Sequence, residues 1–222
     1  MLNKLAFIER DKAYILDGLS NHNSDPMRAE PSRQLFSTRT LSLIVTIVAI
    51  NLSSNYAMIG IPNIKFMDLF VFISGYLMGA IPGIMVGILT WLVYGTLNPY
   101  GFNLVILGAT CLGESIYGLV GWLSAKFGLG SNLPSTKLDD EAFWWTNLKF
   151  GIIGFFLTFI YDLFTNIVSV VIVGLPPIMA IIQGAPFALA HEISNFFFFF
   201  FGCSILVTSI KKIMFEGGER KI

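Results

Sequence analysis

Long apolar segments separated by short turns dominate this sequence and limit the chain to folds that a lipid bilayer can accommodate. A helix needs about 20 apolar residues to cross the hydrocarbon core. We expect six such segments, at 41–58, 66–81, 83–97, 102–125, 148–173 and 179–210, of which the second and third are short. Backbone groups in lipid must hydrogen-bond internally, so each segment should be a helix. The predicted fold is an all-α membrane protein with six transmembrane helices in a compact bundle.

The composition is that of a membrane protein. Hydrophobic residues make up 55% of the chain and charged residues 13%, whereas about a quarter of the residues in a soluble domain are charged. The net charge is zero, which gives no indication of nucleic acid as a partner. Cys111 and Cys203 are isolated within apolar segments and match no metal or redox spacing. We therefore expect neither a resident metal site nor a cofactor.

Short stretches containing Gly and Pro connect the apolar segments. The predicted turns lie at 60–63, 80–83, 98–101 and 174–177, and residues 126–147 form the long polar loop. The last apolar segment is too long for a straight crossing. We expect it either to tilt or to begin near Pro186 after a re-entrant stretch.

Basic residues predict how the chain is oriented. With six crossings, all of the 14 Lys and Arg residues except Lys65 fall on one side of the membrane. Cytoplasmic segments are enriched in Lys and Arg, so both termini should be cytoplasmic. The predicted domains are a cytoplasmic N-terminal tail (1–38), a six-helix transmembrane domain (39–212) and a cytoplasmic C-terminal tail (213–222). Apolar residues over 5–19 fit an interfacial helix or a loosely ordered tail equally well.

Four carboxylates lie within apolar segments or at the mouth of one: Asp68, Glu114, Asp162 and Glu192. A charge at the bilayer centre costs at least about 2.5–3.5 kcal/mol on insertion scales, so such residues usually face a bundle interior and mark a ligand or ion pathway. Counting along the helices from their outer ends places the last three at one level, between the last three helices.

Polar side chains at helical spacing accompany these acids. The candidate substrate-binding residues are Glu114, Tyr117, Asp162, Asn166, His191, Glu192 and Asn195, with Asn55 and Lys65 near the outer ends. The alternative is that these groups satisfy one another as interhelical hydrogen bonds. Lys65 and Asp68, three residues apart, should form an interfacial ion pair or a lid contact to a ligand. The excess of acids favours a ligand with positive charge or several N–H or O–H donors.

The stretch His191-Glu192-Ile193-Ser194-Asn195 resembles part of the zinc-protease motif H-E-x-x-H. The fifth position is Asn195, and the remaining histidine, His22, lies in the N-terminal tail, so no zinc site of that type can form. Nucleophile elbows, phosphate loops and dinucleotide fingerprints are absent as well. We therefore do not expect an enzyme.

The stretch 65–75, followed by the small-residue G-x-x-x-G-type turn within 79–87, leads to a family resemblance. With six short-looped spans and cytoplasmic termini, the chain resembles the substrate-binding (S) components of energy-coupling factor (ECF) vitamin transporters. The resemblance covers about residues 39–212. The N-terminal tail is longer than is usual in that family.

The resemblance implies a function and a set of partners. An S component of such an ABC-type importer captures one micronutrient from outside, among its last three helices, and reorients to release it inside. A transmembrane coupling protein and separate ATPase subunits drive the cycle. Alanines four residues apart on the first helix pack on the coupling protein, and the matching positions here are Ala49, Ser53 and Ala57. The chain would span the plasma membrane of a prokaryote, in contact with lipid.

Two other classes of function are compatible with the residues. In a proton-coupled secondary transporter, Asp162, Glu192 and His191 would relay protons, although the chain shows no obvious inverted repeat and would have to dimerise. A non-transport scaffold subunit would instead have a dry interior whose polar groups satisfy one another. The ligand of a transporter could be a thiamine-like cation, another amine-bearing vitamin or precursor, or a divalent metal.

Overall fold

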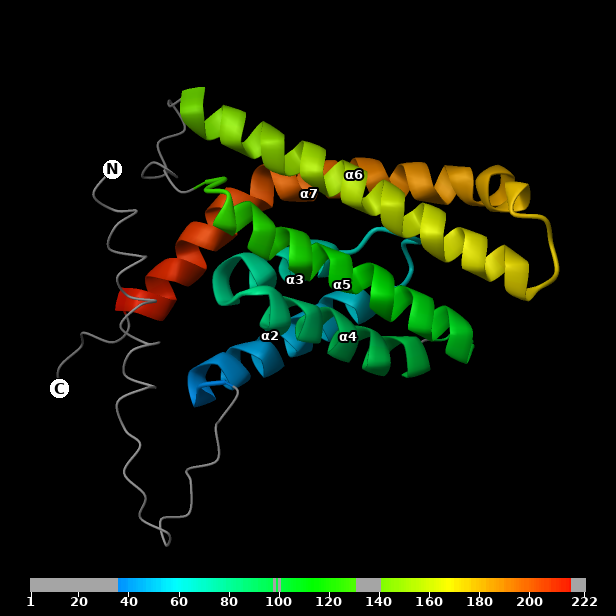
Figure 1. The fold of residues 1–222 in the computed structure, drawn as a ribbon, viewed down its shortest axis with the longest axis horizontal. Coiled ribbons are helices and arrows are strands. Elements are labelled where there is room, and N and C mark those ends of the chain that lie inside the picture. The colour runs from blue at the N-terminus through cyan, green and yellow to red at the C-terminus, as the bar shows by residue number, and fades with distance from the viewer. Residues whose placement is uncertain (1–35, 98, 100, 131–140, 217–222) are drawn as a thin grey trace, which may run out of the picture. The chain divides into compact units, whose positions relative to one another are not determined.

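Six α-helices and no strands make up the part of the chain that the structure describes. This computed structural model describes residues 36–97, 99, 101–130 and 141–216, with side chains as far as residue 212. The helices are α2 (Thr38–Ala57), α3 (Met67–Met78), α4 (Ala80–Leu97), α5 (Leu104–Lys126), α6 (Glu141–Ile172) and α7 (Ile178–Glu216) (Figure 1). The predicted all-α architecture is confirmed, and each expected apolar segment corresponds to one helix.

Side-chain caps define where two of the helices begin. Ser37 accepts a hydrogen bond from the backbone N–H of Thr40 at 3.2 Å, and α2 starts at the next residue. Asn103 accepts from the backbone N–H groups of Val105 and Ile106 at 2.9 and 3.1 Å, and α5 starts directly after it. Both caps satisfy amide donors that would otherwise face lipid or the membrane interface unpaired.

Two predicted boundaries were wrong. The chain reverses at Gly79, whose φ of 103° favours glycine, and α4 already begins at Ala80. The expected turn at 80–83 is therefore the first turn of α4, where Pro82 is tolerated because its missing N–H has no helical acceptor. At the other boundary, α6 begins at Glu141, within the expected polar loop.

The last helix continues through Pro186 without a break, so no re-entrant stretch precedes it.

Five helices are long and apolar enough to cross a membrane. The exception is α3, whose 12 residues extend only about 18 Å, less than the roughly 30 Å of a hydrocarbon core. The chain is a multi-pass membrane protein, while the number of crossings and the side of the termini stay predictions. The apolar pattern over 5–19 and the residues beyond 216 lie outside the described residues.

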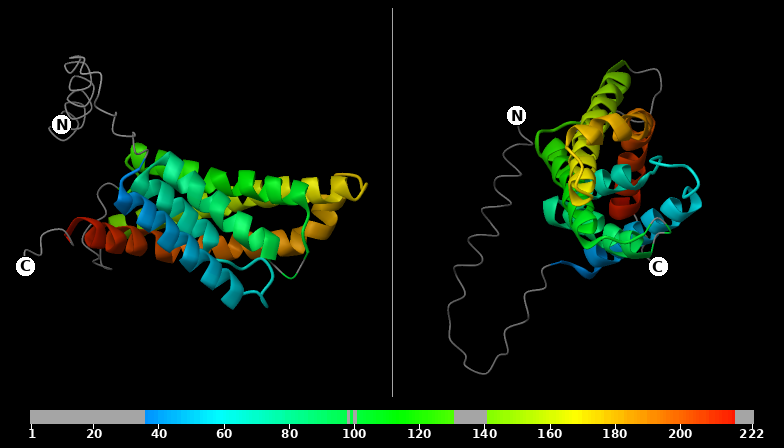
Figure 2. Two further views of the ribbon diagram at one scale, coloured as in Figure 1. Left: turned by 90° about the horizontal axis from the view of Figure 1, so that it is seen from below. Right: turned by 90° about the vertical axis from the view of Figure 1, so that its right-hand side faces the viewer.

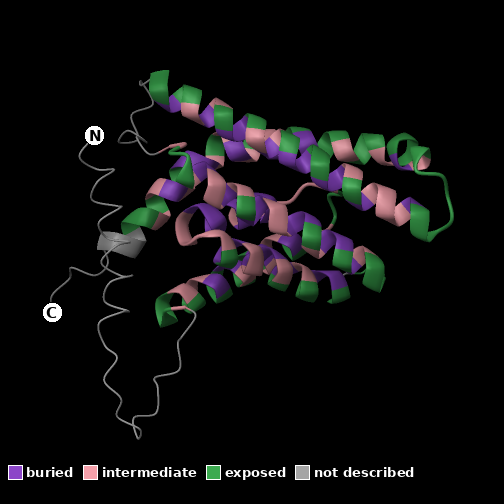
Figure 3. Ribbon diagram, in the orientation of Figure 1, coloured by how far each residue is buried: buried purple, intermediate pink, exposed green. Residues whose placement is uncertain are grey.

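The short helix α3 is the most enclosed element. It packs against α2, α4, α5 and α7, and nine of its residues are buried. The long helices α6 and α7 pack extensively against each other, and α6 also contacts α5. Buried residues follow the inward-facing sides of the helices (Figure 3). Both α6 and α7 extend beyond the other helices at the end that carries their connection (Figure 2).

Close glycine contacts bring α3, α4 and α5 together. A Cβ on Gly75 would lie 1.8 Å from the carbonyl oxygen of Gly118, and one on Gly118 would lie 2.4 Å from the carbonyl carbon of Gly83. These are backbone atoms that cannot move aside, so each position requires glycine. Small residues of this kind are the usual means by which membrane helices approach closely.

Candidate functional site

His191 lies at the centre of a buried ionic group that joins three helices. Its Nδ1 is 3.0 and 3.1 Å from the two carboxylate oxygens of Asp162 on α6, and its Nε2 is 2.8 Å from Asp68 Oδ2 on α3. All three side chains are buried. A neutral imidazole carries a single N–H. If both carboxylates are ionised, both ring nitrogens must donate, and His191 then carries a positive charge.

Asn195 extends this group toward α5. Its Nδ2 donates to Asp68 Oδ2 at 2.5 Å and to Thr158 Oγ1 at 2.7 Å. Thr158 donates its own hydroxyl to the Gly154 carbonyl at 2.8 Å, so it accepts from the Tyr117 hydroxyl, 2.9 Å away. The polar network therefore runs without interruption from α3 through α7 and α6 to α5.

A cavity of about 170 Å³ lies against this group. Asp68, Asp162 and His191 contribute to its wall, and the loop before α3 closes one side with Asn63 and Lys65. Other lining residues come from α4, α5 and α6: Trp91, Ile106, Thr110, Tyr161, Thr165, Asn166 and Ser169. The cavity thus offers aromatic surface together with carboxylate, amide, hydroxyl and ammonium groups. Such a mixture is typical of a small-molecule site.

Lys65 enters the site from the connection between α2 and α3. Asn63, with a left-handed φ of 57°, turns the chain just before it. The Lys65 ammonium lies 5.3 Å from the ring centroid of Trp91 and 4.7 Å from that of Tyr94. Burial lowers the pKa of Lys65, and the charge of Asp68 acts in the opposite direction. The expected ion pair between Lys65 and Asp68 is absent among the described residues, because Asp68 pairs with His191.

Glu114 lies behind the cavity wall rather than in it. It is fully buried, and Trp91, which does line the cavity, donates its indole N–H to Glu114 Oε2 at 3.2 Å. Gly87 makes room for it, since a Cβ there would lie 3.0 Å from Glu114 Cγ. Glu114 thus holds Trp91 in position, and it does not line the cavity beside Asp162 as the sequence predicted.

The predicted outer residue Asn55 also lies outside the cavity lining. It is fully buried and donates to Met67 Sδ at 3.3 Å, while Asn51 on the same helix donates to Thr90 at 3.3 Å. These contacts attach α2 to α3 and α4. Both residues therefore hold helices together through hydrogen bonds, which is the alternative to a role in ligand binding.

Several buried acceptors have no hydrogen-bond donor within the described part of the chain. They are Glu114 Oε1 and the side-chain carbonyls of Asn51, Asn55 and Asn195. Each Asn directs its NH₂ to an acceptor, which determines the orientation of the amide. A buried polar atom without a partner costs about 1–3 kcal/mol. None of these four residues lines the central cavity, so the unpaired atoms do not mark the ligand site.

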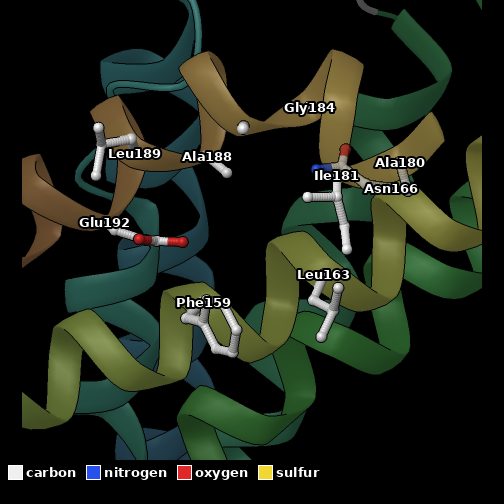
Figure 4. A pocket seen from close by; sticks show the side chains of 10 residues that line it. Phe159, Leu163, Asn166, Ala180, Ile181, Gly184, Ala188, Leu189 and Glu192 are labelled. Carbon is white, nitrogen blue, oxygen red and sulfur yellow. The ribbon is translucent and has the colours of Figure 1, made fainter. Parts of the chain in front are cut away.

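Glu192 is not brought together with the other acids. It lines a second pocket, of about 270 Å³, between α6 and the first half of α7, with Phe159, Leu163 and Ala188 nearby (Figure 4). Asn166 borders both this pocket and the central cavity. Its amide packs closely on α7, since a Cβ on Gly184 would lie 2.5 Å from Asn166 Nδ2. The structure therefore separates Glu192 from the cavity that His191 and Asp162 share.

Of the residues assigned to the site from sequence, the structure unites Lys65, Tyr117, Asp162, Asn166, His191 and Asn195 in or around the cavity. Asp68 and Thr158 were missed as central members. Thr158, Asp162 and Asn166 follow one another at intervals of four and lie on one face of α6. The predicted polar face, which contained Asp162 and Asn166, could therefore have been extended by one turn to Thr158. The sequence predicts Lys65 as the partner of Asp68, because the two residues are only three positions apart. The actual partner, His191, is distant in the sequence and cannot be predicted from spacing.

The small-residue face of α2 is accessible. Ala49, Ser53 and Ala57 are all exposed, as are Ser42 and Thr46 nearer the start of the helix, whereas Ile44 and Ile47 are buried.

His191 offers no free ring nitrogen to a metal, since both face carboxylates. Within the described ranges, no set of three or more His, Cys, Asp or Glu side chains is arranged to hold an ion. Comparisons with protein families, with curated proteins and with solved structures found no match to this chain.

Proposed function

We propose that this protein is the membrane-embedded substrate-binding subunit of an ECF-type importer, which captures a small polar micronutrient and passes it inward. The observation that carries the proposal is the cavity beside His191, Asp68 and Asp162, enclosed by helices and by the loop before α3. Ionisable groups buried in a membrane domain are costly and usually serve a ligand or an ion. The cavity with its polar lining favours this function over a scaffold with a dry, self-satisfied core.

The available space is suited to a vitamin-sized molecule. The central cavity of about 170 Å³ is small, but Lys65 also lines two neighbouring hollows of about 410 and 260 Å³. Small-molecule sites usually have about 300–1,000 Å³. A ligand that moved Lys65 and the adjoining connections by a small amount would join these spaces into one site.

The exposed small-residue face of α2 supports the same proposal. Ala49, Ser53 and Ala57 leave a shallow surface on which a partner helix could approach closely. In this proposal a transmembrane coupling protein occupies that face. The chain carries no nucleotide-binding motif, so ATP hydrolysis belongs to the ATPase partners.

The test begins with the purified protein in detergent. Small molecules extracted from it are identified by mass spectrometry, and water-soluble vitamins are screened by their effect on thermal unfolding. We expect one compound to be bound stoichiometrically or to stabilise the protein in a saturable manner. An empty protein that no compound stabilises would contradict the proposal.

Site variants make the test specific. Asp162→Asn removes a charge from the cavity wall and should weaken binding of the identified compound at least about tenfold, as expected for a charge-assisted contact. Glu192→Gln is the matched control, because it neutralises a carboxylate one residue from His191 in a different pocket. Its binding affinity should stay close to that of the unmodified protein.

A proton-coupled transporter is the second candidate, favoured by the imidazole held between two carboxylates. Uptake into liposomes separates the two functions. A proton gradient alone would drive uptake by a secondary transporter, whereas an S component requires its coupling protein and ATPases.

A further inference from the structure

Lys65 stands where three hollows of the molecule meet. It lines the central cavity with Asp162 and His191, a second hollow with Phe102 and Thr110, and a third with Pro62 and Phe187. Among the residues that the structure describes, no other lines all three. A ligand that enters from the side of the α2–α3 and α4–α5 connections would therefore meet this ammonium.

Within the described part of the chain, the Lys65 ammonium has no ion pair and no hydrogen bond. The two carboxylates of the cavity, Asp68 and Asp162, are both occupied by His191. Glu114 accepts from Trp91 instead. An ammonium has three donors, and a poorly solvated one is costly without an acceptor.

The aromatic neighbours of Lys65 position the ammonium without satisfying it. Trp91 and Tyr94 lie at 5.3 and 4.7 Å from Nζ and attract its charge through their ring faces. Neither ring contact replaces a hydrogen bond from the N–H groups. The Lys65 side chain is thus held where the three hollows meet, and its ammonium N–H groups are still able to donate hydrogen bonds.

We propose that the ligand carries an anionic oxygen group, a carboxylate or a phosphate, which binds to Lys65. This inference rests on the proposed function and names the class of substrate for the same site. The opposite end of the ligand lies toward Asp162. It carries N–H or O–H donors, because an ionised carboxylate can only accept hydrogen bonds. The ligand is therefore amphoteric. The excess of acids in the sequence had favoured a cation, but His191 pairs with two of those acids and offsets one of their two charges, and Lys65 brings a second positive charge to the same cavity.

The experiment compares matched probes on the purified full-length protein. Each pair has one skeleton with and without the anion: nicotinate and nicotinamide, pantothenate and pantothenol, pyridoxine phosphate and pyridoxine. Thermal unfolding and ligand titration are measured for each compound, and the molecules extracted from the protein are identified in parallel. We expect the anionic member of a pair, or an extracted acid, to bind at least about tenfold more tightly than its neutral counterpart. The pyridoxine pair distinguishes a phosphate from a carboxylate.

Variants assign the effect to Lys65. Lys65→Met keeps much of the apolar stem and should abolish the preference for the anion, whereas Lys65→Arg should retain it. Lys126→Met is the matched control, since that ammonium also lies over an aromatic ring, 4.9 Å from Trp122, but lines none of the three hollows. It should bind as the unmodified protein does.

Each outcome is informative. If a neutral or cationic compound binds and Lys65→Met binds it equally well, the inference is overturned and the proposed function stands. If no probe binds and no compound is extracted, the proposed function fails and the inference fails with it. Should Lys65→Met not fold, the comparison of paired probes on the unmodified protein still decides the question.

Discussion

At the scale of residues, the protein is defined by one imidazole shared between two carboxylates in a membrane domain. Each charge taken alone would be expensive in this setting. His191 contacts both acids and offsets one of their two negative charges when it is protonated, and Asn195 adds a hydrogen-bond donor to Asp68. Such a group contributes little net stability, but removing one member leaves an uncompensated buried charge.

This arrangement predicts the effect of His191→Asn. The variant leaves Asp68 and Asp162 without their common cation and should lower the free energy of unfolding by about 3–5 kcal/mol, as for a broken buried ion pair. Thermal unfolding in detergent measures the loss. The double variant His191→Asn/Asp162→Asn removes one of the stranded charges and should recover part of it. Equal stability of the single variant and the unmodified protein would show that these contacts are unimportant.

At the scale of elements, α3 holds the fold together although it is the shortest helix. It is surrounded by four others, and glycines on α3, α4 and α5 let their backbones approach within contact distance. The helix boundaries depend on local chemistry, with Ser37 and Asn103 as caps and Gly79 as the sharp turn. Because that information is local, the sequence placed the helix ends to within a few residues, apart from the early start of α6 at Glu141 and the late end of α7 at Glu216.

The glycine contacts predict opposite effects for two substitutions in α5. In Gly118→Ala the new Cβ would lie 2.4 Å from the Gly83 backbone, so α4 and α5 must separate, at a cost of about 1–3 kcal/mol or more. In Gly108→Ala the Cβ meets nothing within 4 Å, and the better helix propensity of alanine should stabilise the protein by up to about 1 kcal/mol. The fraction of protein that stays monodisperse after heating distinguishes them. Similar behaviour of the two variants would contradict the close packing.

At the scale of the whole molecule, the direction of the helices alternates along the chain. The connections α2–α3, α4–α5 and α6–α7 consequently lie toward one end of the bundle, and the start of α2, the end of α5 and the end of α7 lie toward the other. The cavity is bordered on the side of the first of these ends by Asn63 and Lys65 of the α2–α3 connection. The distribution of Lys and Arg predicts that this end is the external one.

Cysteine labelling tests that orientation. In a background with Cys111 and Cys203 replaced, Ile61→Cys and Leu175→Cys place thiols on two of the connections at this end of the bundle, where both residues are exposed. Phe127→Cys places one just after α5, at a residue that is 82% exposed. A membrane-impermeant maleimide should label the first two in intact cells and the third only after permeabilisation. The reverse pattern would show that the site faces the cytoplasm.

The sequence by itself determined the class of the protein, the position of its helices and the polar residues that lie within them. Length, apolar content and turn residues act over a few neighbouring positions, so they can be read without knowing the fold. The face that α6 presents, with Asp162 and Asn166 four residues apart, was predictable for the same reason. Both residues line the central cavity.

Only the tertiary structure decided which of those polar residues meet. His191 and Glu192 are neighbours in sequence, yet about 100° separates them around a helix, so the rotation of α7 determines which one faces the cavity. That rotation depends on distant packing, in which Phe196 and Phe199 fit against Gly151 and Gly154 of α6. The same packing brings His191 to Asp68, 123 residues away in the chain. No local pattern contains such a contact, because it arises from how complete helices fit together.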